Sequence, residues 1–216
     1  MSESVYQRVL AEKFAELDPR LRAYFGRPLA GSVGVGAGRY EVAGSRHRWL
    51  SPVFAFLAWR RLLFPEYGRD IPFRVVNTTD TEGALSAERT FEFETRTRVM
   101  QDRMTVVDGA LHDRLGRRGG LEVELELEVR YGALRMTSRR QWLRAGRLRL
   151  RIPGIVRVRL DERSTATRQR VDVRLTAPVL GEVFRYAGEF DYRVVAADML
   201  GDTISTSDPS PEPFRG

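Results

Sequence analysis

The sequence has no cysteine, a single lysine (Lys13) and two histidines, His47 and His112. Without cysteine there can be no disulfide, thiolate metal ligand or cysteine nucleophile, and this composition fits a reducing compartment. Two histidines far apart in the chain give little basis for a metal site. We therefore expect a cytoplasmic protein with no metal and no cofactor.

No apolar run is long enough to span a membrane, which takes about 20 residues. The most apolar stretch, 53–64, is interrupted by Arg60 and Arg61, and the N-terminus lacks the apolar core of a signal peptide. A Walker motif and the G-x-S-x-G elbow are also missing. The glycine-rich stretch 31–38 is followed by Arg39, where a dinucleotide fingerprint requires glycine, so it indicates a bent strand.

The net charge of +7 comes almost entirely from arginine. A positive balance suits an anionic partner. However, most of these arginines alternate with glutamates, which is typical of a solvated sheet face. The pattern also lacks the aromatic platform of a single-strand nucleic-acid binder. We expect no nucleic-acid partner, a possible hydrophobic or anionic small molecule, and at most a weak contact with a membrane surface.

Residues 121–131, LEVELELEVRY, alternate strictly between apolar and polar side chains. This period of two predicts a strand with one buried and one solvated face. Similar strands with tight connections are expected throughout 71–194. Because a large sheet curls and closure removes its exposed edges, the fold class should be mainly β (α+β). We expect a curved antiparallel meander sheet or barrel of about 8–10 strands.

Two further segments have helical spacing, and they lie at 4–25 and 51–64. The second is apolar nearly all round, so it is either buried or part of an interface. We expect these helices at one end of the sheet or over its open side. The domain prediction is one domain over 1–202, followed by a disordered tail at 203–216 that is rich in serine and proline.

Four segments carry a family resemblance: VYQRVLAEKFAELDPRLRAYF, PEYGRDIPFRV, WLRAGRLRLRIPG and APVLGEVFRYAGEFDY. Together they resemble a bacterial domain-of-unknown-function family, which occurs alone or fused C-terminal to saccharopine-dehydrogenase-like reductase domains. The similar region extends from Tyr6 to Val194. The resemblance implies no activity and no catalytic residues, and the fusion partner points to small-molecule metabolism.

Turn chemistry predicts how the strands pair. Asp108-Gly109 is a two-residue hairpin signal that sets Met104 opposite Asp113. Loops at 118–120, 132–133 and 144–146 continue the register, and a turn at 95–96 would place Arg89 opposite Asp102. Side chains on one face form the predicted interior. Its central row is Met104, Asp113, Leu125, Arg140, Leu150, Val158, Val173 and Tyr186, and a neighbouring row contains Asp102 and Trp142.

The charged residues on this predicted interior face are the most informative: Arg89, Asp102, Asp113 and Arg140, with Arg98 if the 95–96 turn holds. An unpaired charge in a dry interior is prohibitive, so these groups should pair or face water. They would form either a structural ion-pair network or a wet ligand cavity. In a cavity, a carboxylate could act as a base and an arginine could hold an anionic head group. The aromatic residues Trp142, Tyr186 and Tyr192 would line the walls.

Three functions remain open. The first is binding of a hydrophobic or amphipathic small molecule in a barrel cavity. The second is a cofactor-independent isomerase or cyclase that uses Asp102 or Asp113 with Arg140. The third is peripheral membrane or partner binding through helix 51–64. A cavity would favour the first two, whereas a filled core with Phe54, Phe56 and Trp59 exposed would favour the third. Ligand, reaction and oligomeric state stay open.

Overall fold

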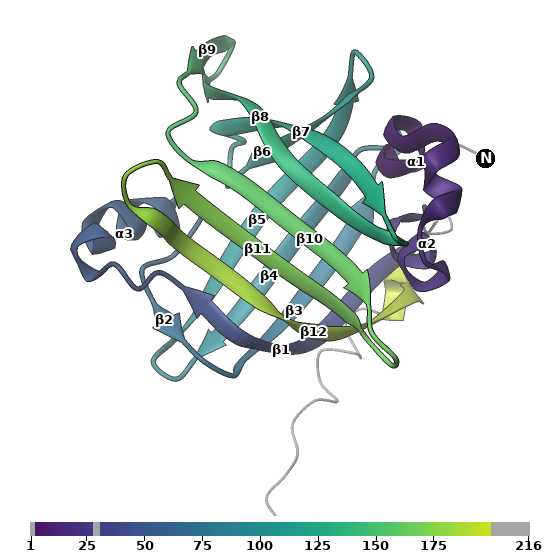
Figure 1. The fold of residues 1–216 in the computed structure, drawn as a ribbon, viewed down its shortest axis with the longest axis horizontal. Coiled ribbons are helices and arrows are strands. Elements are labelled where there is room, and N and C mark those ends of the chain that lie inside the picture. The colour runs from purple at the N-terminus through teal and green to yellow at the C-terminus, as the bar shows by residue number, and fades with distance from the viewer. Residues whose placement is uncertain (1–2, 28–30, 200–216) are drawn as a thin grey trace, which may run out of the picture.

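The computed structural model describes residues 3–27 and 31–199, in which ten antiparallel strands close into a barrel (Figure 1). The order around the wall is β10-β11-β12-β1-β3-β4-β5-β6-β7-β8, and β8 pairs with β10 to close it. The expected mainly β barrel is therefore confirmed. The wall strands are β1 (Ser32–Gly44), β3 (Ile71–Thr79), β4 (Leu85–Phe93), β5 (Arg96–Val107), β6 (Ala110–Leu115), β7 (Leu121–Arg130), β8 (Ala133–Ala145), β10 (Arg157–Ser164), β11 (Gln169–Ala177) and β12 (Gly181–Ala196).

Two short strands lie beside this wall. β2 (Tyr67–Gly68) pairs with the end of β1, and β9 (Leu148–Ile152) pairs with the second half of β8. The first half of β8 pairs with β10, so the predicted pairing of Leu150 with Val158 is wrong. β8 is long enough to pair with β10 along its first half and with β9 along its second half. The β8–β9 hairpin therefore projects beyond the rim of the barrel.

Helices occupy both ends of the barrel (Figure 1). At one end, α1 (Val5–Leu10), a 3-10 turn (Ala11–Glu16) and α2 (Pro19–Phe25) cover the opening, and we call this the N-terminal end. At the other, a 3-10 turn (Arg48–Leu50) leads into α3 (Ser51–Trp59). A last 3-10 turn (Ala197–Met199) follows β12 at the N-terminal end, where Ala197 N donates to Gly31 O. The predicted helix at 51–64 ends early because Arg61 has a φ of 58°, which turns the chain so that Leu62 and Phe64 enter the core.

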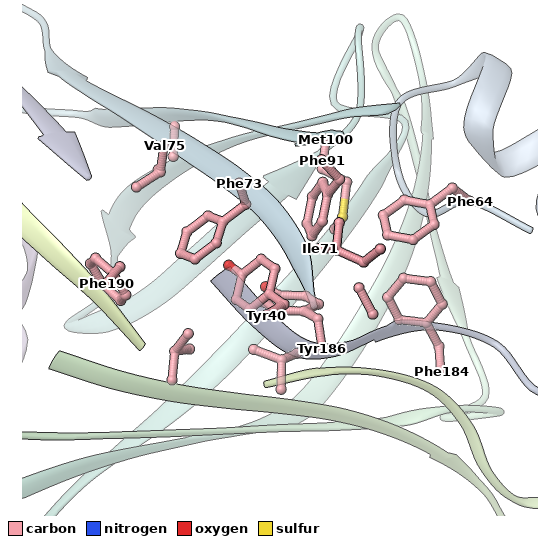
Figure 2. Close-up of a cluster of buried hydrophobic side chains, with 14 of the residues drawn as sticks. Tyr40, Phe64, Ile71, Phe73, Val75, Phe91, Met100, Phe184, Tyr186 and Phe190 are labelled. Carbon is pink, nitrogen blue, oxygen red and sulfur yellow. The ribbon is translucent and has the colours of Figure 1, made fainter. Parts of the chain in front are cut away.

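The interior is filled by two apolar clusters. One lies toward α3 and contains stacked and edge-on aromatic rings, such as Tyr40 on Phe73 with 3.7 Å between centroids (Figure 2). The other lies under α1 and α2. A cavity of about 10 Å³ beside Tyr6, Tyr24 and Asn77 has room for a single water. Each fully buried large side chain stabilises the barrel by about 1.5–3 kcal/mol.

Glycine allows this filling along β1. Gly34, Gly36 and Gly38 lie on its inner side, and a Cβ atom at Gly34 would overlap the ring of Tyr192. At Gly36 it would press on Phe190. The glycine-rich stretch is thus a strand, as predicted, and its missing side chains are replaced by aromatic rings from β12.

The strand register is partly as predicted. Met104 lies opposite Asp113 and Val173 opposite Tyr186, which confirms those two pairings. Other pairs of strands, among them β4–β5, β6–β7 and β10–β11, are shifted by two residues. The β6–β7 connection spans five residues, 116–120, so Asp113 faces Val123 rather than Leu125. A shift of two preserves which face each side chain occupies, so Asp113 still points inward.

A bulge in β8 changes the faces of two predicted residues. Ser138 lies opposite Leu125, but Arg140 lies opposite Glu124, so Arg139 is an extra residue on one strand. Beyond the bulge, inward and outward positions are exchanged. Arg140 and Trp142 therefore lie on the outer surface, and their predicted inward orientation is wrong. No turn signal in the sequence marks such a bulge.

Candidate functional site

The barrel interior contains a buried ion pair near its middle. Arg89 on β4 pairs with Asp102 on β5, and their side chains are 16% and 4% exposed. Ala87 lies directly opposite Asp102, so the two partners meet diagonally. The predicted contact is present, although the predicted register is two residues off. Arg98 also pairs, with Glu66, at a separation of 2.6 Å near the α3 end of the barrel.

Two further carboxyl groups share this interior. Burial raises the pKa of Asp113 well above its usual range; the charge of Asp102 raises it further, while Arg89 lowers it. Burial also raises the pKa of Glu162 to about 7. The hydrogen bond from Gln169 and the charge of Arg89 lower this pKa, but burial outweighs them. Arg89 thus pairs with Asp102, and its positive charge also acts on the carboxyl groups of Asp113 and Glu162. At neutral pH, a pKa of about 7 leaves Glu162 about half protonated.

Several buried polar atoms of this interior have no hydrogen-bond partner among the described residues. They are Asn77 Oδ1, Asp102 Oδ2, Asp113 Oδ1 and Gln169 Oε1. All four are oxygen acceptors, so the cluster would be satisfied by additional hydrogen-bond donors. Most buried polar groups in proteins are paired, which makes this group unusual. Tyr186 lies in the same interior, where burial raises the pKa of its hydroxyl to about 12.

Arg140 and Trp142, which were also predicted to line a cavity, belong to a cluster on the outer surface. Arg140 pairs with Glu124 at 3.2 Å. Trp142 stacks on His112 with 5.5 Å between ring centroids, and the guanidinium of Arg149 lies 3.9 Å from the Trp142 ring. His112 is buried here, with Nδ1 beside the carboxylate of Glu122. The site prediction thus combined residues from both faces of the wall.

Glu122 lies at the centre of this outer cluster. Arg144 and Arg149 each approach its carboxylate to 2.7 Å, and His112 Nδ1 lies 2.9 Å away. Burial alone would raise the pKa of Glu122, but these hydrogen bonds outweigh it and lower the pKa to about 2. Since Arg144 and Arg149 belong to β8 and β9, Glu122 fastens the projecting hairpin to the outer wall.

Exposed apolar side chains gather at the rim opposite α1 and α2. Among the described residues, eleven large exposed apolar side chains lie there, against three (Val107, Tyr131 and Val194) at the N-terminal end. Phe56 is 59% and Trp59 66% exposed, whereas Phe54 is buried in the core. The eleven are Trp49, Val53, Phe56, Trp59, Tyr67, Leu143, Leu148, Leu150, Ile155, Val179 and Leu180.

Backbone contacts join these segments into one rim. Arg117 N donates to Arg60 O, which ties the β6–β7 loop to the end of α3. Arg144 N donates to Gly120 O, which ties that loop to the β8–β9 hairpin, and His47 Nε2 lies 3.0 Å from the carbonyl oxygen of Glu182, at the β11–β12 turn. We call this surface the α3 end (Figure 1).

The α3 end is also rich in arginine. Residues 139–157 carry seven arginines and no carboxylate. Arg46, Arg48, Arg60 and Arg61 flank α3, and the guanidinium of Arg60 lies 5.7 Å from the Trp59 ring. The sequence predicts the apolar helix, but its general alternation of arginines with glutamates assigns these arginines to a solvated sheet face. The run 139–157 was the available signal, because no glutamate interrupts it.

Comparison with known sequences adds a family and no activity. No helix in the described part of the chain has the length and apolar content that a membrane span requires. A search of curated proteins found no match. A family model with the description "Domain of unknown function (DUF4166)" matches residues 17–190, which include α2 and nearly all of the barrel. The chain therefore belongs to this domain-of-unknown-function family.

Proposed function

We propose that the protein docks reversibly on an anionic membrane surface through the α3 end. The observation that carries this proposal is the concentration of exposed apolar side chains and arginines on one rim of the barrel. Tryptophan and other large apolar residues favour the lipid–water interface, and arginines are attracted to anionic lipids. A filled interior with Phe56 and Trp59 exposed supports this function over binding in a cavity.

The geometry of α3 suits insertion into lipid. Val53, Phe56 and Trp59 recur every three residues on its outer side, while Phe54 and Leu57 pack on the barrel core. The helix is therefore held in place by one side and presents the other. An arginine near an anionic surface contributes about 1 kcal/mol, and a fully buried large side chain about 1.5–3 kcal/mol. Several such groups acting together would give measurable but reversible binding.

Vesicle flotation would test this proposal. We expect the protein to float with phosphatidylcholine vesicles containing phosphatidylserine, and to detach as salt is raised because charge attraction is screened. The double variant Phe56→Ser/Trp59→Ser should bind several-fold more weakly. A matched control, Val107→Ser/Tyr131→Ser, removes exposed apolar groups at the opposite end and should bind as the wild type does. No flotation, or equal losses in both variants, would refute the proposal.

A second candidate is binding of a small molecule in the barrel interior. The four buried acceptor oxygens without partners favour it, because an amine or hydroxyl ligand would supply donors. Such a ligand would have to displace side chains beneath α1 and α2, where the cavity is about 10 Å³. Native mass spectrometry of protein purified from its own host would test this idea. A co-purified mass that is lost on unfolding would support it, and bare protein would count against it.

The isomerase or cyclase hypothesis loses its proposed residue pair. It combined Asp102 or Asp113 with Arg140, but Arg140 pairs with Glu124 on the outer surface. The guanidinium that faces the two aspartates is Arg89. A raised pKa at Asp113 is compatible with proton transfer, yet the filled interior gives a substrate little access. We therefore rank membrane docking above catalysis.

A further inference from the structure

A groove of about 350 Å³ lies at the base of the β8–β9 hairpin. Its lining consists of three arginines, Arg139, Arg140 and Arg151, together with Gln141 and residues 152–154. The groove lies where β8 and β9 stop pairing. β8 has its bulge at Arg139, and Pro153-Gly154 leads the chain from the end of β9 toward β10. Gln141 Nε2 donates to Val156 O at 2.5 Å and holds the returning chain beside β8.

The hairpin beside this groove has two different faces. Along β9 the residues alternate as LRLRI, so Leu148 and Leu150 point away from Arg149 and Arg151. Leu148, Leu150 and the nearby Ile155 are 65%, 58% and 64% exposed. The contacts of Glu122 with Arg144 and Arg149 keep the hairpin in this orientation. Exposed apolar side chains therefore lie directly beside the arginine-lined groove.

Two of the three groove arginines are available to a ligand. Arg140 is held by the buried Glu124. Arg139 lies 3.8 Å from Glu126, and both side chains are more than half exposed, so this pair is weak. Arg151 makes no ion pair or side-chain hydrogen bond with any described residue. One guanidinium group can contact two phosphate oxygens at once, so two available guanidinium groups on one groove suit a doubly charged phosphate.

We propose that this groove binds the phosphate monoester head group of an anionic lipid while Leu148, Leu150 and Ile155 enter the adjoining apolar layer. This inference rests on the membrane docking proposed above and names the lipid chemistry that the α3 end selects. A phosphate monoester can accept from several guanidinium groups at once. The head group of phosphatidylserine carries an ammonium group, which the arginines would repel.

Flotation with two vesicle types tests the selection. Phosphatidylcholine vesicles would contain either phosphatidic acid or phosphatidylserine, adjusted to the same surface charge. The wild type should bind the phosphatidic acid vesicles about tenfold more tightly. The variant Arg139→Gln/Arg151→Gln should lose this preference, and its binding to phosphatidylserine should weaken only as far as the loss of two charges requires. Thermal unfolding should match the wild type, because neither side chain is buried.

The control variant Arg117→Gln/Arg118→Gln removes the same charge from the neighbouring β6–β7 loop. It should weaken binding to both vesicles equally and keep the preference. Equal binding of the wild type to both vesicles would overturn the head-group site while leaving membrane docking intact. No binding to either vesicle would refute both proposals. Micromolar binding of inorganic phosphate without vesicles would assign the groove to a free anion and overturn the lipid assignment.

Discussion

Replacing Glu162 by glutamine should stabilise the protein at neutral and alkaline pH. The carboxyl group is 4% exposed, and burial raises its pKa from 4.5 to about 7. Because the folded state binds this proton more tightly than the unfolded state, ionisation favours unfolding. The penalty is absent below pH 4.5, grows between pH 4.5 and 7, and is complete above pH 7. At 1.36 kcal/mol per pKa unit, it reaches about 3 kcal/mol.

The variant Glu162→Gln removes the charge and retains an oxygen that can accept from Gln169 Nε2. Urea denaturation at pH 5 and pH 8 should therefore show a free energy of unfolding about 3 kcal/mol above the wild type at pH 8. At pH 5 the difference should be small. Glu126→Gln is the matched control, since that side chain is 59% exposed on the outer surface. Equal effects of Glu162→Gln at the two pH values, or a loss of stability at pH 8, would refute this reasoning.

Three other substitutions probe the interior and the hairpin. Arg89→Leu leaves Asp102 buried without its partner and should cost about 3–5 kcal/mol in urea denaturation, with recovery in the double variant Arg89→Leu/Asp102→Leu. Glu122→Gln should loosen the β8–β9 hairpin, so that amide exchange in 144–152 becomes faster at pH 7 than in the wild type; unchanged exchange would show that the arginines are not what holds it. Gly34→Ala places a Cβ atom in the ring of Tyr192 and should lower the stability by about 1–3 kcal/mol in thermal unfolding, whereas no loss would mean that β1 shifts to make room.

Much of the architecture follows from local patterns. The alternation in 121–131 and the Asp108-Gly109 turn predict adjacent antiparallel strands, and they lie where expected. Parity along those strands also predicts Asp102 and Asp113 inside the barrel. The same parity extends from Leu160 to Glu162, so this interior carboxyl group could have been included. It was overlooked because it lies at the end of its predicted strand.

The features that could not be predicted arise from pairing across longer distances. A single extra residue at Arg139 reverses the faces of Arg140 and Trp142, and its insertion depends on how β8 fits both β7 and its other neighbours. Whether β9 joins the wall or leaves it depends in turn on where β10 finds a partner. The buried position of Glu122 depends on contacts with His112, Arg144 and Arg149, which come from three different strands. Such choices are made by tertiary packing rather than by local sequence.

The departure of β9 from the barrel has a consequence for self-association. A strand inside a closed barrel has both sets of backbone groups paired, but β9 is bonded to β8 along one side only in the part of the chain described. An open edge of this kind can add a strand from another molecule. β9 is short, carries Arg149 and Arg151, and is followed at once by Pro153. These properties discourage edge-to-edge pairing, so the arginines that suit a lipid head group would also help keep separate copies of the chain apart.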